Sequence, residues 1–228
     1  MKILIATDSF KGSLTSIQAG QAIAKGISLS NANATVDLCP IADGGEGTVD
    51  AFLAATKATK TVVKVTGPLG KQVDCVFCRL GDLAVLEMAS CAGLGLVGQN
   101  KNPLVATTFG VGETILQAIK LGCKKFVVGI GGSATNDGGI GMLQALGFDF
   151  FDGNGKPVAF GANGLKDLCR ISTSHKNPLL FQCEFVVACD VTNPLCGQDG
   201  CSHVYAPQKV QRHKWQTIWI CGCKTMHN

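Results

Sequence analysis

The sequence lacks long apolar runs, which excludes one large class of proteins. No stretch of its 228 residues approaches the ~18–20 consecutive apolar residues of a membrane-spanning helix. The apolar stretch at residues 3–6 is also much shorter than the ~7–15-residue core of a secretory signal peptide. We therefore expect a cytoplasmic protein with no membrane partner.

Charged side chains are scarce, at 16% of the chain against a usual ~25%. Up to residue 208 the cations and the acids balance, with 16 of each, so the whole net charge of +4 lies in residues 209–228. That segment contains no acid and both tryptophans, Trp215 and Trp219. A basic tail with aromatic side chains is one signature of a nucleic-acid-binding arm.

Cysteine, by contrast, is abundant, with 12 residues. Without a secretory signal, this number indicates reduced thiols in a cytoplasm. The spacings Cys75–Cys78 and Cys221–Cys223 leave a zinc site as an alternative, but zinc requires a closed set of four ligands. Cys75 and Cys78 also fall inside an expected strand, so small buried thiols are the better interpretation.

The first third of the chain has an α/β pattern. Apolar runs at 2–6, 34–41 and 61–65 read as strands, with helices expected to start near Thr15 or Ser16 and again at residue 48. Strands separated by helices predict a parallel sheet, because such crossover connections are right-handed. The third of these strands, at 61–65, is assigned to the same parallel sheet as the first two.

The pattern changes after residue 66. Two apolar segments flank Gly81-Asp82, which is typical of a β-hairpin. A helix is then expected near 111–121, a strand at 124–130, a helix near 138–146, a turn at 152–155 and a strand at 184–190. The sequence therefore predicts two packed α/β pieces, the second containing a mixed sheet.

Four polar segments follow expected strands, at residues 7–13, 43–48, 129–139 and 190–194. Ligands bind at the carboxyl edge of open α/β sheets. The third segment is the strongest signal, because a strand followed by glycines, hydroxyls and a helix can bind phosphate through backbone N–H groups. It matches neither the Walker A pattern nor a clean dinucleotide fingerprint.

Together these segments contain the parts of a phosphoryl-transfer site. Acids can hold Mg²⁺ with waters and phosphate oxygens, and a lysine can neutralise charge on the transferred group. The alternative is purely structural, since glycine-rich loops and acids at strand ends often only shape turns.

The same segments resemble the bacterial glycerate kinase family of the glycerate 2-kinase type. The resemblance rests on DSFKGSL, ADGGEGTVDA, VTGPLG, GIGGSATNDGG with GMLQALG, VACDVTNPL and APQK, in family order over residues 1–209. It implies an ATP-dependent kinase that phosphorylates a hydroxyl of D-glycerate. It also implies a flavodoxin-like parallel-sheet domain, interrupted by a second α/β domain with a mixed sheet.

The site roles are hypotheses built on this resemblance. Asp137 and Asp190 are candidates for binding Mg²⁺ or for accepting the hydroxyl proton of glycerate, and Lys11 for pairing with a phosphate or the glycerate carboxylate. The predicted catalytic residues are thus Asp190, Asp137 and Lys11. The predicted substrate- and phosphate-binding residues are Asp8, Ser9, Ser13, Asp43, Glu46, Gly131, Gly132, Ser133, Asn136 and Asn193.

The resemblance stops abruptly after Lys209. If one base were lost after that codon, the tail read in the other frame could begin Gly-Ala-Thr-Pro, as the family does. We therefore interpret 210–228 as an aberrant, out-of-frame tail and expect no nucleic-acid partner. Residues 1–66 then form an incomplete parallel-sheet domain with exposed apolar faces, and 67–209 the second domain. Such a chain is expected to be an impaired kinase or, alternatively, a non-catalytic fragment.

Overall fold

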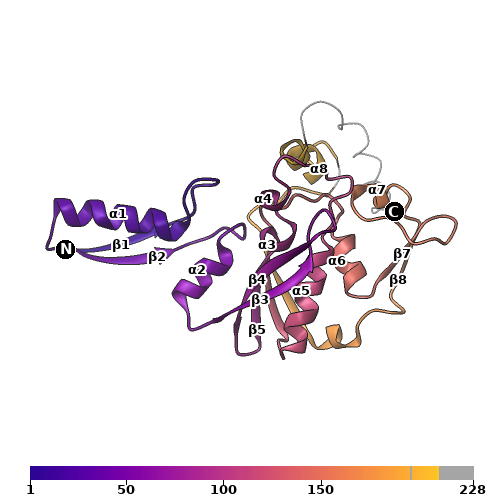
Figure 1. Ribbon diagram of the computed structural model, residues 1–228, viewed down its shortest axis with the longest axis horizontal. Helices are drawn as coiled ribbons and strands as arrows, with labels where there is room; N and C mark the ends of the chain where they lie inside the picture. Colours follow the sequence, from indigo (N-terminus) through magenta and orange to yellow (C-terminus); the bar gives the residue numbers. More distant parts are fainter. Residues whose placement is uncertain (196, 211–228) are drawn as a thin grey trace.

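The computed structural model describes residues 1–195 and 197–210. The described residues form three sheets: a large five-stranded one, a smaller parallel one that projects from the body of the molecule (Figure 1), and a short antiparallel pair at residues 149–151 and 170–172. The principal elements are β1 (Lys2–Thr7), α1 (Ser16–Ser30), β2 (Thr35–Pro40), α2 (Thr48–Ala55), β3 (Thr59–Thr66), β4 (Gln72–Leu80), β5 (Leu83–Glu87), α3 (Ala89–Ala92), α4 (Leu94–Val97), α5 (Phe109–Lys120), β6 (Lys125–Gly129), α6 (Ile140–Ala145), β9 (Glu184–Ala188) and α8 (Cys201–Tyr205). Smaller elements are β7 (Asp149–Phe151), α7 (Ala162–Leu165), β8 (Arg170–Ser172), and the 3₁₀ turns η1 (Pro178–Gln182) and η2 (Ala206–Lys209).

The larger sheet has five strands in the order β3-β4-β5-β6-β9. β4 is antiparallel to both of its neighbours, β3 and β5, whereas β5, β6 and β9 are parallel to one another. The carboxyl ends of these three parallel strands therefore lie along one edge of the sheet. This edge carries Glu87, the glycine-rich segment after Gly129, and Asp190.

Helices cover both faces of this sheet. On one face Val111 and Ile115 of α5 pack in the main apolar core with the buried strand side chains Phe77, Leu86 and Phe126. On the other face Val49 of α2 packs with Cys78 and Val85, supported by Phe52 and Leu53. Burial on both faces stabilises the sheet through apolar area removed from water, and it fixes the strand ends that carry the polar loops.

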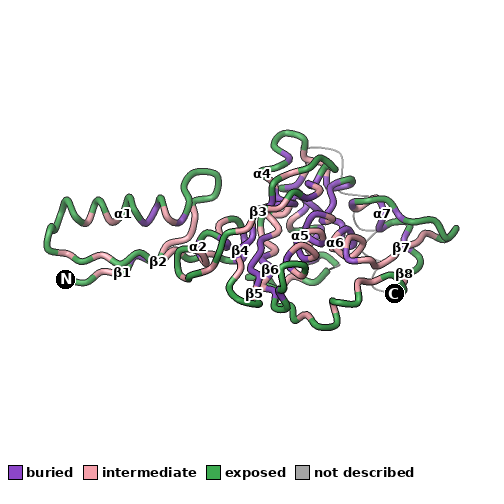
Figure 2. The backbone as a smooth tube through the Cα atoms, turned by 60° about the horizontal axis from the view of Figure 1, so that its bottom comes forward, coloured by how far each residue is buried: buried purple, intermediate pink, exposed green. Residues whose placement is uncertain are grey.

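The smaller sheet consists of β1 and β2, which are parallel and covered by α1 on one face. Thr15 caps α1: its hydroxyl accepts the N–H of Gln18, whose side chain accepts the N–H of Thr15 in return. The face away from α1 carries Leu4, which is 66% exposed. Figure 2 shows this part of the chain as largely exposed or intermediate, in contrast to the buried body.

The strand at 59–66 is in the larger sheet and not in the parallel one, so its predicted partner was wrong. β3 pairs antiparallel with β4 across a turn in which Gly67 and Lys71 are joined by a backbone hydrogen bond of 2.7 Å. The segment TGPLG thus forms the turn of a β-hairpin. The division of the chain at residue 66 stays a prediction, and the tail from residue 211 lies outside the described residues.

The other main elements occur where the sequence predicts them. The Gly81-Asp82 hairpin is confirmed by the pairing of Leu80 with Leu83, and the expected helix near 111–121 is α5. β6, α6 and β9 likewise lie within their predicted ranges. In the part of the chain that the structure describes, no helix combines the length and apolarity that crossing a membrane demands.

Candidate active site

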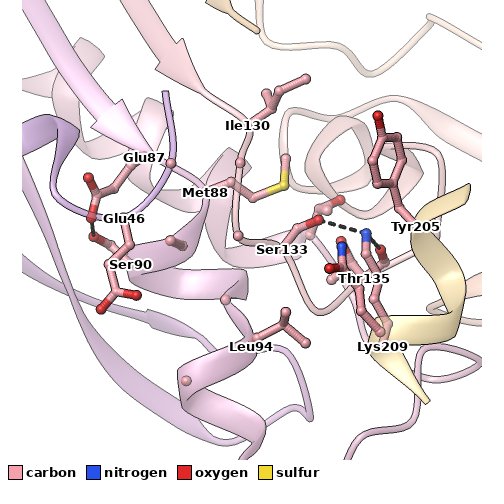
Figure 3. Close-up of a pocket in the computed structure, with 18 of the residues that line it drawn as sticks. Glu46, Glu87, Met88, Ser90, Leu94, Ile130, Ser133, Thr135, Tyr205 and Lys209 are labelled. Carbon is pink, nitrogen blue, oxygen red and sulfur yellow. Dashed lines mark hydrogen bonds between the residues drawn. The ribbon is translucent and has the colours of Figure 1, made fainter. Parts of the chain in front are cut away.

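One large cavity, of about 1110 Å³, lies where the loops after β1 and β2 face the carboxyl edge of the five-stranded sheet. Figure 3 shows a close-up of its lining. Ten of the thirteen predicted site residues line this cavity: Ser9, Lys11, Asp43, Glu46, Gly131, Gly132, Ser133, Asn136, Asp137 and Asp190. The structure thus brings together four segments that are far apart in the sequence.

Two glycine runs meet at the floor of the cavity. The N–H of Gly131 donates to the carbonyl oxygen of Gly44 at 3.1 Å, which ties the loop after β6 to the loop after β2. A Cβ on Gly131 would lie 2.7 Å from Cα of Gly45, and one on Gly129 would lie 2.3 Å from the Gly44 oxygen. Glycine is therefore required here because only a backbone without Cβ allows this approach.

The next part of the glycine-rich segment has unused donors. Residues 132–134 lie alongside residues 92–94 as in a strand pair. The Gly132 carbonyl accepts the N–H of Leu94, and the Ala134 N–H donates to the Ala92 carbonyl. Among the described residues, the N–H groups of Gly132 and Ser133 donate to no protein acceptor. Both residues line the cavity, so these two N–H groups are candidate donors to an anion, whereas the N–H of Gly131 is already engaged.

Asp137 is almost fully buried and orders this segment. Its carboxylate accepts the N–H and the hydroxyl of Thr108, both at 2.8 Å, and the N–H groups of Gly139 and Gly141. Burial raises the pKa of Asp137, while these four hydrogen bonds act in the opposite direction. The carboxylate therefore fastens the segment to the start of α5.

Lys11 and Asp43 face each other across the opposite wall. The Lys11 Nζ lies 3.7 Å from the Asp43 carboxylate, and the Lys11 side chain is 86% exposed. Asp43 also accepts the N–H of Gly45 at 2.9 Å, which shapes the glycine turn. An exposed ion pair of this kind contributes little to stability, so Lys11 is free to turn toward a bound anion.

Glu87, at the end of β5, is a cavity residue that the sequence analysis missed. One carboxylate oxygen accepts the N–H groups of Gly47 and Val49, both at 3.1 Å, and the other accepts the Ser90 hydroxyl at 3.2 Å. Burial raises the pKa of Glu87 against the effect of these bonds. Glu87 caps α2, whose own N-cap residue is a glycine with no side chain to do so.

Lys209 and Tyr205 were also missed as site residues, although APQK belongs to the resemblance. Lys209 is only 8% exposed, and its Nζ donates to the Ser133 hydroxyl at 2.9 Å and to the Thr135 carbonyl at 2.7 Å (Figure 3). Burial lowers the pKa of Lys209 to about 8, partly offset by the charges of Cys201 and Asp137. Its position in a late 3₁₀ turn, 74 residues beyond Thr135, gave no sequence signal of this contact.

The three remaining predicted residues are not among those lining the cavity. The Asp8 carboxylate accepts the N–H of Ser9 at 2.6 Å, and the Ser13 N–H closes a turn on Phe10. Asn193 accepts the Tyr205 hydroxyl at 2.6 Å and donates to the Asp199 carbonyl. In this structure these residues hold loops that carry lining residues, and a direct role for them stays a prediction.

Comparison with known proteins identifies the family. The sequence profile of the Glycerate kinase family matches residues 3–217. The chain belongs to the glycerate kinase family. This family member is 48% identical over 212 residues to the glycerate 2-kinase of Escherichia coli K12, and 48% identical over 210 residues to the glycerate kinase of Halalkalibacterium halodurans.

The fold agrees with this assignment. The crystal structure of a protein assigned as glycerate kinase 2 from Salmonella typhimurium LT2 superposes with a TM-score of 0.83 at 41% identity, covering 100% of this chain and 61% of that one. The α/β architecture, with a parallel two-stranded sheet and a mixed five-stranded sheet, is therefore confirmed. The alignment with the Escherichia coli relative covers 92% of this chain but 56% of the relative, and that with the Halalkalibacterium relative covers 91% and 55%. The chain therefore spans little more than half the length of these relatives.

Proposed function

We propose that the cavity binds ATP and D-glycerate and supports transfer of the γ-phosphoryl group to a hydroxyl of glycerate. The observation that carries this proposal is the convergence of two glycine-rich loops, from separate sheets, on one cavity. The cavity contains unused N–H donors and two lysines, which suit the phosphate groups of ATP. It also contains an exposed acid, Asp190, which suits the hydroxyl group of glycerate. Family membership supplies the substrate class.

Asp190 is the better-placed proton acceptor. It follows β9, lines the cavity and is exposed. In the proposed step the glycerate hydroxyl oxygen forms a bond to the γ-phosphorus while the bond from that phosphorus to the β,γ-bridging oxygen breaks. The hydroxyl proton passes to the Asp190 carboxylate, and ADP leaves with the bridging oxygen.

The residues also fit a magnesium ion bound with the nucleotide. Mg²⁺ is usually held by one or two carboxylates together with waters and phosphate oxygens, so a full protein cage is not needed. No group of three or more potential ligands occurs within residues 1–195 and 197–210. Asp190 would hold the ion as an alternative to its role as proton acceptor, and the ion when bound would neutralise phosphate charge. The carboxylate of Asp137 is already engaged by Thr108, Gly139 and Gly141, so its metal role is the weaker part of the proposal.

A second candidate is a catalytically incomplete chain that requires another polypeptide. The observation favouring it is the uncovered face of the two-stranded sheet, where Leu4 is largely exposed. A cavity with one wall on so small a sheet would hold its reacting groups less firmly, and phosphoryl transfer depends on positioning. This candidate predicts ligand binding with little or no turnover.

The test is glycerate-dependent formation of ADP by the purified 228-residue chain. The first candidate predicts turnover with MgATP and D-glycerate, at a rate that Asp190→Asn lowers by about 10²-fold or more. ³¹P NMR of the product would then show which hydroxyl carries the phosphate. Tight ATP binding without ADP formation would favour the second candidate, and binding of neither substrate would contradict both.

A further inference from the structure

Lys209 is a buried cation with no acid in ion-pair contact among the described residues. Its two protein contacts are neutral oxygens, the Ser133 hydroxyl and the Thr135 carbonyl. An ammonium group has three N–H donors and is costly to bury without an anion nearby. Such an arrangement is stabilised when a negatively charged ligand enters.

That charge lies beside the glycine-rich turn at Gly132 and Ser133. Lys209 contacts the side chain of Ser133, whose own N–H, with that of Gly132, has no acceptor among the described residues. All three residues line the cavity. Figure 3 shows the Lys209 amine directed at Ser133 and Thr135. Two backbone N–H groups and one ammonium group on neighbouring lining residues are the donor types that bind the oxygens of a phosphate group.

The segment that carries Lys209 is held against the site. Asn136 donates to the Ser202 hydroxyl at 3.0 Å, and Tyr205 donates to Asn193 at 2.6 Å. Lys101 donates to the Gln208 carbonyl at 3.2 Å from outside the cavity. These contacts fix the turn at Ala206–Lys209, so the Lys209 amine is positioned before any ligand arrives.

We propose that Lys209, together with the N–H groups of Gly132 and Ser133, binds a phosphate group of the nucleotide. This inference rests on the proposed function for the identity of the ligand. It assigns the phosphate contact to a residue distant in sequence from the glycine-rich segment. Lowering of the Lys209 pKa to about 8 agrees with it, because burial disfavours the charge and the protein compensates for this only in part.

The test compares Lys209→Met with Lys101→Met, a lysine that contacts the same segment outside the cavity. Binding of ATP, of inorganic tripolyphosphate and of adenosine is measured on the full chain by calorimetry. We expect Lys209→Met to weaken ATP and tripolyphosphate binding by about 10- to 100-fold while leaving adenosine binding within about twofold. Lys101→Met should leave all three unchanged.

Equal losses for ATP and adenosine, or ATP and tripolyphosphate affinities within about twofold of wild type, would overturn the inference. Lys209→Gln keeps an N–H donor for the Thr135 carbonyl and serves if the methionine variant does not fold. A measurement on the wild-type chain needs no variant: tripolyphosphate should protect Lys209 from acetylation more than Lys101, as read by mass spectrometry. Equal protection of the two lysines would also overturn it.

The outcomes separate this inference from the proposed function. Tripolyphosphate binding that depends on Lys209, without glycerate-dependent turnover, would keep the inference and contradict the kinase proposal. Turnover by the wild-type chain, with unchanged phosphate affinity in Lys209→Met, would keep the kinase proposal and contradict the inference. A wild-type chain that binds neither ATP nor tripolyphosphate would contradict both.

Discussion

The N–H of Gly131 donates to the carbonyl oxygen of Gly44 at 3.1 Å, and this bond joins the loop after β6 to the loop after β2 beside the cavity. Gly131 lies in the loop that follows β6, and Gly44 lies in the loop that follows β2. Because both loops are glycine-rich, their backbones approach closely enough to form one continuous lining. The site is therefore made by contact between loops and depends on the absence of side chains at this point.

Substitution of Gly131 by alanine should damage both stability and ligand binding. The new Cβ would lie 2.7 Å from Cα of Gly45, so the two loops would have to separate. We expect a loss of about 1–3 kcal/mol in the free energy of unfolding, measured by urea denaturation. Gly26→Ala in α1 is the matched control, since nothing lies within 4 Å of its Cβ position. It should stabilise the chain by about 0.5–1 kcal/mol. Equal behaviour of the two variants would refute the close-approach argument.

Glu87→Ala should be far more damaging than Glu87→Gln. Alanine leaves the buried N–H of Val49 without an acceptor, at about 1–3 kcal/mol, and the partly buried N–H of Gly47 as well, at a smaller cost. Glutamine can place its oxygen at the position that accepts both groups and donate its amide to Ser90. Urea titrations of both variants provide the measurement. A glutamine variant as unstable as the alanine variant would show that the charge, and not the geometry, supports α2.

Glu87 also predicts a pH dependence with a definite sign. Burial raises its pKa above the ordinary value of 4.5, so the folded state retains the proton to a higher pH than the unfolded state does. The contribution of this group to stability is complete below 4.5 and is lost as the pH rises through the folded-state pKa. Glu87→Gln lacks this loss. Its unfolding free energy minus that of wild type should therefore increase with pH above 4.5 and then level off. A difference that decreases over that range would contradict the raised pKa.

The uncovered face of the small sheet predicts self-association. Leu4 is 66% exposed there, whereas its neighbour Ile5 is 6% exposed and faces α1. Leu4→Ser should reduce aggregation, measured by light scattering, with little change in the unfolding free energy. Ile5→Ser should destabilise the chain by at least about 2 kcal/mol, because it removes packing against α1. Unchanged scattering in Leu4→Ser would mean that another surface drives association.

Much of the fold was predictable because its signals are local. The Thr15 cap, the Gly81-Asp82 hairpin and the apolar strands each depend on residues close together in the chain. The strand that pairs with β3 was not predictable in this way, because strand pairing is decided by contacts across the sheet. Its alternation of Val63 and Val65 with exposed Val62 and Lys64 fits an antiparallel strand with one covered face, and this pattern carried the missed information.

The candidate site divides in the same way. Residues after strand ends, such as Asp43 and Ser133, could be placed because parallel strands bring their carboxyl ends to one edge. The roles of Glu87 and Lys209 could not be predicted, since each acts through a contact with a residue at least 38 positions away in the chain. Asp137 looked like a free acid in the sequence, and only the structure shows that Thr108 and two glycines engage it.

The most direct test of the central claim follows the backbone amide signals of the ¹⁵N-labelled full chain during titration with MgATP. The account predicts that the largest shifts fall on Gly132 and Ser133, with smaller ones on Gly44 and Gly45 across the cavity, and that D-glycerate then perturbs residues around Asp190. Saturable MgATP binding with its shifts confined elsewhere, and none at Gly132 or Ser133, would contradict it.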